Sequence, residues 1–125
     1  MLFDTDILIW ALRGHLGAAA LLEGSVERCI STITYMELIR GARDRHHIGG
    51  IRAFVDDLAF QVLPLTENTG HRAIIYLEEY GLRSGFDIAD ALIAATAVEQ
   101  GLVLCSGNEK HFRAIAELVV QAFRP

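Results

Sequence analysis

The feature that most constrains the fold of this chain is one continuous pattern from Ser84 to Cys105, in which a helix leads directly into a buried strand. Small and apolar residues recur at helical spacing as far as Gly101, and glycine is the residue that most often follows the end of a helix. The residues from Leu102 to Cys105 are all apolar, as in strands that are covered on both faces. A helix followed by such a strand is typical of α/β folds with a parallel sheet.

Two acids, Asp87 and Asp90, lie three residues apart at the start of this helix. Both have a structural interpretation, because the spacings Ser84-x-x-Asp87 and Asp87-x-x-Asp90 each match a capping box, and the helix dipole favours acids in a first turn. For either acid alone, helix capping is the simpler explanation. A chemical role for them needs support from elsewhere in the chain.

Strand-like and helix-like segments alternate along the rest of the sequence. Further strands are expected at residues 1–3, 29–31, 60–63 and 118–120, and further helices at residues 7–12, 18–22, 32–41, 51–58, 66–81 and 109–116. This alternation predicts a single α/β/α sandwich domain over residues 1–125, with a central, mainly parallel sheet and right-handed crossovers.

The composition narrows the class of protein. Hydrophobic residues make up 52% of the chain, yet no apolar run approaches the roughly 20 residues that span a bilayer. The first residues carry acids where a signal peptide carries basic residues, so we expect a cytoplasmic protein without a membrane segment. The apolar excess predicts a protein interface in addition to a core. Cys29 and Cys105 lie in apolar runs, as reduced core cysteines do.

Acids also follow the first two predicted strands. Asp4 comes directly after the first strand, and the carboxyl ends of strands are where open α/β sheets bind ligands. Capping of the next helix explains Asp4 equally well, although we expect Asp6 to be the better cap of the two. Glu37, on the helix after the second strand, is explained equally well by a capping box with Thr34.

If the strand ends gather at one edge, Asp4, Glu37 and Asp90 meet in one crevice, with Ser106 and Asn108 beside them after the fourth strand. The turn that contains Ser106 and Asn108 is also explained by local turn chemistry alone. Three clustered carboxylates repel one another unless a cation lies between them, and sites made only of oxygen ligands favour Mg²⁺ or Mn²⁺. Such an ion suits phosphodiester hydrolysis, because it activates water and neutralises charge on the phosphate oxygens.

Nucleic-acid binding is not favoured by the net charge of −5, so it would depend on local arginines or on metal ions. The segment of residues 40–47 holds three arginines and two histidines. Arg40 and Arg43 are candidates for contacts with substrate phosphates, although a solvated charged surface explains this segment as well.

Four segments, in the same order along the chain, resemble the PIN-domain ribonucleases, most closely the VapC-type toxins. These segments are DTDILIW, ITYMELIRGA, DIADALIAATAVEQGLVLCSGN and NEKHF. The resemblance covers nearly the whole chain. It implies a compact α/β/α fold, Mg²⁺- or Mn²⁺-dependent endoribonuclease activity, a homodimer and a cognate antitoxin as protein partner.

Carried over by position, the resemblance implies that Asp4, Glu37 and Asp90 form the acidic triad that holds metal and positions water. The fourth family position is often an acid, but here it is Asn108, with Ser106 where threonine is common. A neutral amide implies weaker binding of a second metal ion. Asp87 and Asp6 are secondary candidates, since Asp87 has no clear equivalent in the family core.

Two alternative functions remain at the level of sequence. Asp4-Thr5-Asp6 after a strand also resembles the first motif of haloacid-dehalogenase-type phosphatases, but the only lysine, Lys110, follows the last turn instead of lying where such enzymes need it. The second alternative is a PIN-like module that binds RNA or protein without cutting. The presence of all three acids argues against this module, since it has no need of clustered carboxylates.

Overall fold

The computed structural model describes residues 1–83 and 85–125 of the chain. Within these residues five parallel strands form one sheet in the order β3-β2-β1-β4-β5. The strands are β1 (Leu2–Phe3), β2 (Cys29–Ser31), β3 (Gln61–Leu63), β4 (Leu104–Ser106) and β5 (Val120–Ala122). The helices are α1 (Thr5–Leu12), α2 (Leu16–Glu23), α3 (Thr32–Arg40), α4 (Arg45–Asp57), α5 (Glu67–Tyr80), α6 (Ile88–Gln100) and α7 (Glu109–Phe112).

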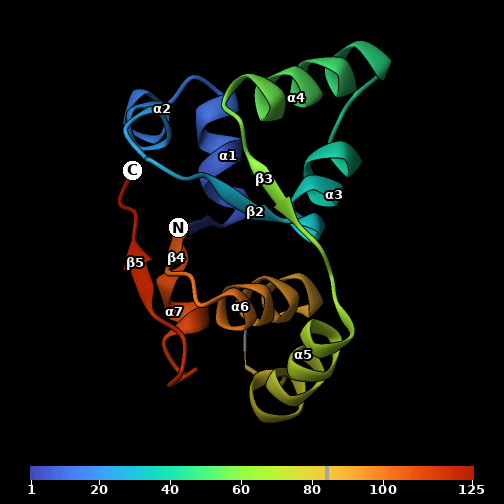
Figure 1. The fold of residues 1–125 in the computed structure, drawn as a ribbon, viewed down its shortest axis with the longest axis vertical. Coiled ribbons are helices and arrows are strands. Elements are labelled where there is room, and N and C mark those ends of the chain that lie inside the picture. Colours follow the sequence, from blue (N-terminus) through green and yellow to red (C-terminus); the bar gives the residue numbers. More distant parts are fainter. Residues whose placement is uncertain (84) are drawn as a thin grey trace.

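Helices cover both faces of the sheet (Figure 1). Alternate strand residues point to opposite faces, so Leu2 and Leu104 pack in one apolar cluster with α5 and α6, while Phe3 and Cys105 pack in the other with α1 and α4. The predicted α/β/α sandwich with a parallel sheet is therefore confirmed. Cys29 and Cys105 are free and buried, as predicted.

The order of the strands places a topological switch point at β1. The chain moves from β1 to β2 and β3 on one side of the sheet, and to β4 and β5 on the other. In open α/β sheets, ligands bind in the crevice at such a point, beyond the carboxyl ends of the strands. The residues that follow β1 and β4 are therefore the ones that line it.

The last two predicted strands lie two residues further along the chain than the apolar pattern indicated. Leu102 is still tied to the end of α6, because its backbone N–H donates to the carbonyl of Ala97 at 2.9 Å. Gly101 ends α6 in a left-handed conformation with φ 63°, which confirms the predicted helix stop. Strand β4 then begins at Leu104, opposite Leu2. Strand β5 begins at Val120, opposite Leu104 in β4.

Helices α4 and α7 differ most clearly from their predicted bounds. Helix α7 ends at Phe112 instead of residue 116. Helix α4 begins at Arg45, six residues before the predicted start at residue 51, because the Asp44 carboxylate accepts a hydrogen bond from the His47 N–H at 2.8 Å and caps it. Part of the charged segment 40–47 is therefore helical. In the part of the chain that the structure describes, no single helix is long and apolar enough to cross a membrane; α1 and α2 pass that test only as a pair, bent by 117°.

Candidate active site

Strands β1 and β4 bring two polar side chains together at the switch point. Asp4 follows β1 and Ser106 ends β4, and the two strands are paired through Phe3 and Cys105. The Ser106 hydroxyl donates a hydrogen bond to Oδ2 of Asp4 at 2.6 Å, and the Asn108 backbone N–H donates to the Ser106 hydroxyl at 2.9 Å. The turn after β4 therefore holds the carboxylate that follows β1.

Asp4 is the residue that caps α1, since its Oδ1 accepts from the backbone N–H of Thr5 at 2.8 Å. The prediction that Asp6 is the better cap is wrong, because α1 begins at Thr5 and Asp6 already lies in its first turn. Asp4 is only 5% exposed. Burial, followed by the negative charge of Asp6, raises the pKa of Asp4 to about 7.

Asp6 instead joins α1 to the turn after β4. Its Oδ2 accepts hydrogen bonds from the Gly107 N–H at 2.9 Å and from the Asn108 side-chain amide at 3.3 Å. Its Oδ1 is buried without a hydrogen-bond partner among the described residues, and burial raises the pKa of Asp6. A Cβ on Gly107 would come within 2.6 Å of Asp6 Oδ2, so any larger residue would displace the Asp6 carboxylate.

Glu37 does not take part in a capping box. Helix α3 begins at Thr32 and is capped by the Ser31 hydroxyl, so the predicted capping box of Glu37 with Thr34 is wrong. The Glu37 carboxylate accepts instead from the Thr5 hydroxyl at 2.6 Å, and the Thr5 and Thr34 hydroxyls are hydrogen-bonded at 3.0 Å. Thr5 thus links Glu37 to α1. Sequence analysis missed this role, although the position of Thr5 between two acids was its visible signal.

Asp87 and Asp90 form a reciprocal capping box at the start of α6. The Asp87 side chain accepts from the Asp90 N–H at 2.9 Å, and Asp90 accepts from the Asp87 N–H at 3.2 Å. The predicted Asp87-x-x-Asp90 box is confirmed, whereas the box predicted for Ser84 with Asp87 lies outside the described residues. Asp87 is exposed, as expected of a residue that serves chiefly as a cap.

Asp90 also faces the other acids. Burial raises the pKa of Asp90 to about 6, and the negative charge of Glu37 contributes to this rise. The charge of Asp90 in turn contributes to the raised pKa of Asp4. His111 of α7 lies beside Asp90, with its Nδ1 3.5 Å from Asp90 Oδ2. Sequence analysis did not single out His111, although it lies in the NEKHF segment.

The donor chemistry of this crevice fits a hard cation such as Mg²⁺ or Mn²⁺, because every candidate ligand is an oxygen and Asp6 Oδ1 is a buried oxygen that no other described residue hydrogen-bonds. The raised pKa values of Asp4 and Asp90 have the same origin, namely carboxylates buried near one another. Among the described residues, however, no three metal-binding side chains lie close enough together to enclose an ion. The acids are thus gathered in one crevice but not arranged as a closed set of ligands.

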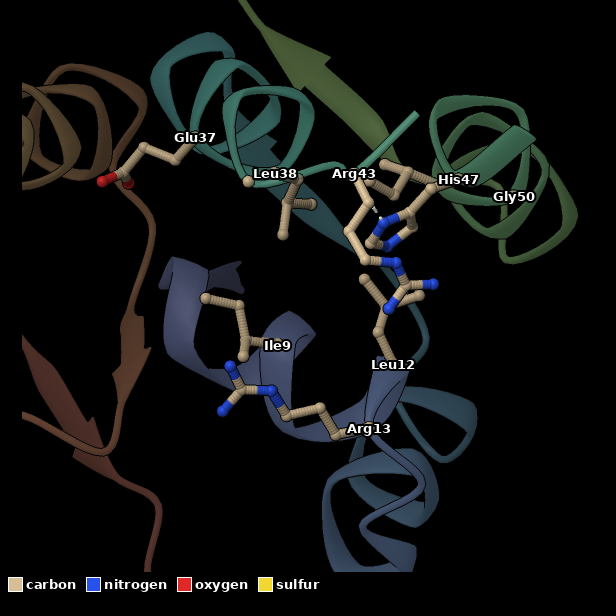
Figure 2. Close-up of a pocket in the computed structure, with 10 residues that line it drawn as sticks. Ile9, Leu12, Arg13, Glu37, Leu38, Arg43, His47 and Gly50 are labelled. Atoms are coloured by element: carbon tan, nitrogen blue, oxygen red, sulfur yellow. Dashed lines mark hydrogen bonds between the residues drawn. The ribbon is translucent and has the colours of Figure 1, made fainter. Parts of the chain in front are cut away.

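A groove of about 580 Å³ runs from Glu37 along α1, between this helix and α4 (Figure 2). Apolar side chains, including Ile9 and Leu12, line it together with Arg13 and Arg43, which approach from the end of α1 and from the segment before α4. Arg40 does not lie in this groove. It borders a different hollow, over the outer side of α3.

The comparisons with known proteins agree with this geometry. Residues 1–118 match the PIN domain. The chain belongs to the PIN-domain family. Among its relatives, Ribonuclease VapC10 of Mycobacterium tuberculosis (strain CDC 1551 / Oshkosh) is 33% identical, over 94% of this chain and 90% of that protein.

Solved structures also resemble this PIN-domain protein. A toxin–antitoxin complex from Klebsiella pneumoniae contains a chain with a TM-score of 0.79 and 33% identity, with 94% of each chain covered. VapBC2 from Rickettsia felis, bound to a DNA fragment from its promoter, has a TM-score of 0.76 at 21% identity over 98% of each chain, a likeness that concerns the fold alone. The resemblance to VapC-type PIN ribonucleases is thereby confirmed, and the family is not that of the haloacid-dehalogenase-type phosphatases.

Proposed function

We propose that this protein is a Mg²⁺- or Mn²⁺-dependent endoribonuclease, that residues 1–125 form one PIN-like nuclease domain, and that it acts in the cytoplasm as the toxin of a type II toxin–antitoxin pair. The observation that carries this proposal is the group of acids at the switch point of the sheet. Asp4 is buried there, and the charges of Asp90 and Glu37 are close enough to contribute to the raised pKa values in the crevice. The membership in the PIN-domain family supports the same function.

In this proposal Asp4, Glu37 and Asp90 hold the metal ion. When bound, the ion supplies an activated water and neutralises charge on the phosphate. The residues around the acids orient them: the Ser106 hydroxyl holds Asp4, and the Thr5 hydroxyl holds Glu37. Each of these oxygens thus has a defined direction before substrate arrives.

Asn108 gives a reason to expect one strongly bound ion instead of two. Its side chain is a neutral amide, so it cannot offset the charge of a second ion. This amide also already donates to Asp6 Oδ2 at 3.3 Å. Asp6 and Asn108 therefore serve chiefly to line the site and to hold the turn after β4 in place through their hydrogen bonds. A second ion would rely on Asp6 Oδ1, the buried oxygen that has no hydrogen-bond partner in the described part of the chain.

The proposal is tested with purified protein freed of any antitoxin. Single-stranded and looped RNAs are incubated with Mg²⁺, with Mn²⁺ and with EDTA, and the Asp4→Asn variant is measured in parallel. We expect cleavage only with metal, and a loss of at least about a hundredfold for the variant. Cleavage that is undiminished by EDTA would contradict the metal mechanism. The absence of cleavage under every condition would contradict the proposed ribonuclease activity.

The groove between α1 and α4 supports a protein partner, which we propose to be the cognate antitoxin. The related Klebsiella pneumoniae chain was solved in a toxin–antitoxin complex. The groove combines apolar walls with the carboxylate of Glu37 at one end, which fits an apolar peptide that ends in an arginine. Co-expression with the neighbouring reading frame tests this: Leu12→Asp should abolish co-purification, whereas an antitoxin bound equally well by this variant would place the interface elsewhere.

Of the two predicted phosphate contacts, we propose Arg43, which lines the groove. Arg40 lies on the other side of α3 and is the matched control. Arg43→Ala should weaken RNA binding and lower its salt dependence, and Arg40→Ala should change both much less. Equal effects of the two substitutions would show that RNA does not follow the groove.

A homodimer is the remaining part of the proposal. The hollow over the outer side of α3 has a volume of about 470 Å³ and exposes apolar side chains, with Met36 53% and Val62 39% exposed. An exposed apolar surface of this kind is typical of an interface between subunits. Light scattering should show a dimer at micromolar concentration, and Met36→Glu should convert it to a monomer. A wild-type protein that is monomeric under these conditions would contradict this part.

A further inference from the structure

A cluster of three rings lies on the β5 side of the candidate active site. Trp10 of α1 contacts His15, with ring centroids 5.2 Å apart and an interplanar angle of 63°. His15 contacts Phe123, which follows β5, at 5.8 Å and 79°. Both contacts are edge-to-face, and Trp10 remains 39% exposed. Trp10 and His15 belong to neither of the two apolar core clusters.

The cluster borders the site directly. Trp10 lies one helical turn after Asp6, so their side chains are neighbours on one stripe of α1, roughly 5 to 6 Å apart at Cβ. Phe123 donates its backbone N–H to the carbonyl of Ser106 at 2.8 Å, and the hydroxyl of Ser106 holds Asp4. The rings therefore continue the wall that Asp6 and the turn after β4 form beside the acids.

The cluster is also held in place by a hydrogen bond. His15 accepts a hydrogen bond at Nδ1 from the Ala18 N–H at 3.0 Å, which fixes the orientation of its ring. Two arginines lie near the cluster in the sequence: Arg13 lines the groove between α1 and α4, and Arg124, next to Phe123, is ion-paired with Glu109 at 2.9 Å. An exposed ring that is held in this way favours a ligand with a flat aromatic face.

We propose that Trp10, supported by His15 and Phe123, is a stacking platform for a nucleobase of single-stranded RNA next to the phosphate that is cut. This inference rests on the proposed ribonuclease function and adds a binding site to it. Sequence-specific and non-specific recognition of single strands both use bases that stack on aromatic side chains, because every base offers a flat face. The acids would then act on the phosphate, and the platform would fix the nucleotide beside it.

Trp10 is the only tryptophan of the chain, so its fluorescence reports on this site alone. The first experiment titrates wild-type protein, in EDTA, with a single-stranded RNA dodecamer of mixed sequence while anisotropy of a labelled copy measures binding. We expect binding to quench the tryptophan, and the same dodecamer with abasic residues to bind more weakly without quenching. RNA that binds without any change in the fluorescence would overturn the platform.

The second experiment measures cleavage of the dodecamer with Mn²⁺ by Trp10→Leu and Trp10→Phe. Loss of one stacked base should raise KM about five- to a hundredfold for Trp10→Leu with little change in kcat, and Trp10→Phe should recover most of the loss. Leu16→Ala is the matched control, because Leu16 is an 84% exposed apolar residue on the adjacent α2. Thermal melting establishes that the variants are folded. The fluorescence titration uses only wild-type protein, so it tests the platform even if a variant fails to fold.

Each outcome bears on a separate statement. If the wild type cuts RNA but Trp10→Leu has an unchanged KM, the ribonuclease function stands and the platform is wrong. If Trp10→Leu cuts normally and instead fails to bind the co-expressed antitoxin, the rings form a protein interface and the platform is equally wrong. If the wild type neither binds nor cuts RNA, the proposed function fails and the platform fails with it.

Discussion

Replacing Asp90 by Asn should lower the activity and, at the same time, stabilise the metal-free protein. Burial is the main cause that raises the pKa of Asp90 from 3.8 to about 6, so the folded protein disfavours the ionised form. A difference of about two pKa units corresponds to roughly 3 kcal/mol of unfolding free energy, the upper limit of the gain. An Asn oxygen can still accept from the Asp87 N–H, so most of the capping box is kept.

The sign of the effect depends on pH. Because the pKa of Asp90 is higher in the folded protein than in the unfolded chain, its contribution to stability is complete below about pH 4 and is lost as the pH rises through about 6. The Asn variant has no such loss. We therefore expect the two proteins to be equally stable near pH 4, and the variant to be more stable by up to about 3 kcal/mol at pH 8.

Asp87 is the matched control, since it lies in the same capping box but is exposed. Asn is as good a helix cap as Asp, so Asp87→Asn should change the unfolding free energy by less than about 1 kcal/mol and leave most of the activity. Asp90→Asn should cost at least about a hundredfold in cleavage rate, the scale for removal of one preorganised electrostatic group.

The assay is urea unfolding in EDTA at pH 4 and pH 8, repeated at pH 8 with Mn²⁺, together with cleavage rates. Metal should stabilise the wild type and not Asp90→Asn, because only a protein that binds the ion gains from it. A variant that is no more stable than the wild type at pH 8 in EDTA would refute the reasoning from burial. Equal losses of activity for both variants would show that Asp87 also serves the site.

Three further predictions concern the acids and the residues that hold them. Thr5→Val should lower the cleavage rate about tenfold or more, because it releases Glu37. Thr5→Ser keeps the hydroxyl and should retain most of the rate when both variants are measured on the same RNA. Metal affinity measured by calorimetry should rise with pH up to about 7, because Asp4, whose pKa is about 7, must lose its proton to bind. Gly107→Ala should impair activity and stability because the new Cβ meets a carboxylate oxygen, whereas Gly49→Ala, with open space around it in α4, should be neutral or slightly stabilising in thermal melts.

The pattern of small and apolar residues predicted α6, its end at Gly101 and the strand that follows, because hydrophobic periodicity and helix stops are local properties. The exact limits of β4 were not determined by the local sequence. Leu102 and Val103 are as apolar as the strand itself, and only the pairing of Leu104 with Leu2 and Val120 determines where β4 begins. The same holds for β5, whose start follows from its pairing with β4.

The roles of the acids divide in the same way. The sequence by itself determined which side chains could do chemistry, and its spacing correctly predicted the capping box between Asp87 and Asp90. Spacing misassigned Glu37 and Asp6, because a capping interpretation depends on the first residue of the helix. Helix α1 begins at Thr5 directly after β1, so Asp4 became the cap and Asp6 was left free to bind the turn after β4.

Only the tertiary structure decided which of these side chains meet. Asp4 and Ser106 are 102 positions apart, and their hydrogen bond exists because β4 pairs directly with β1 in the order β3-β2-β1-β4-β5. The link from Thr5 to Glu37 arises in the same way, from the packing of α1 against α3, and the ring contact of His15 with Phe123 arises from the position of β5. The physical reason is that hydrophobic periodicity encodes which face of an element is buried, whereas the neighbour that buries it is chosen by the whole sheet.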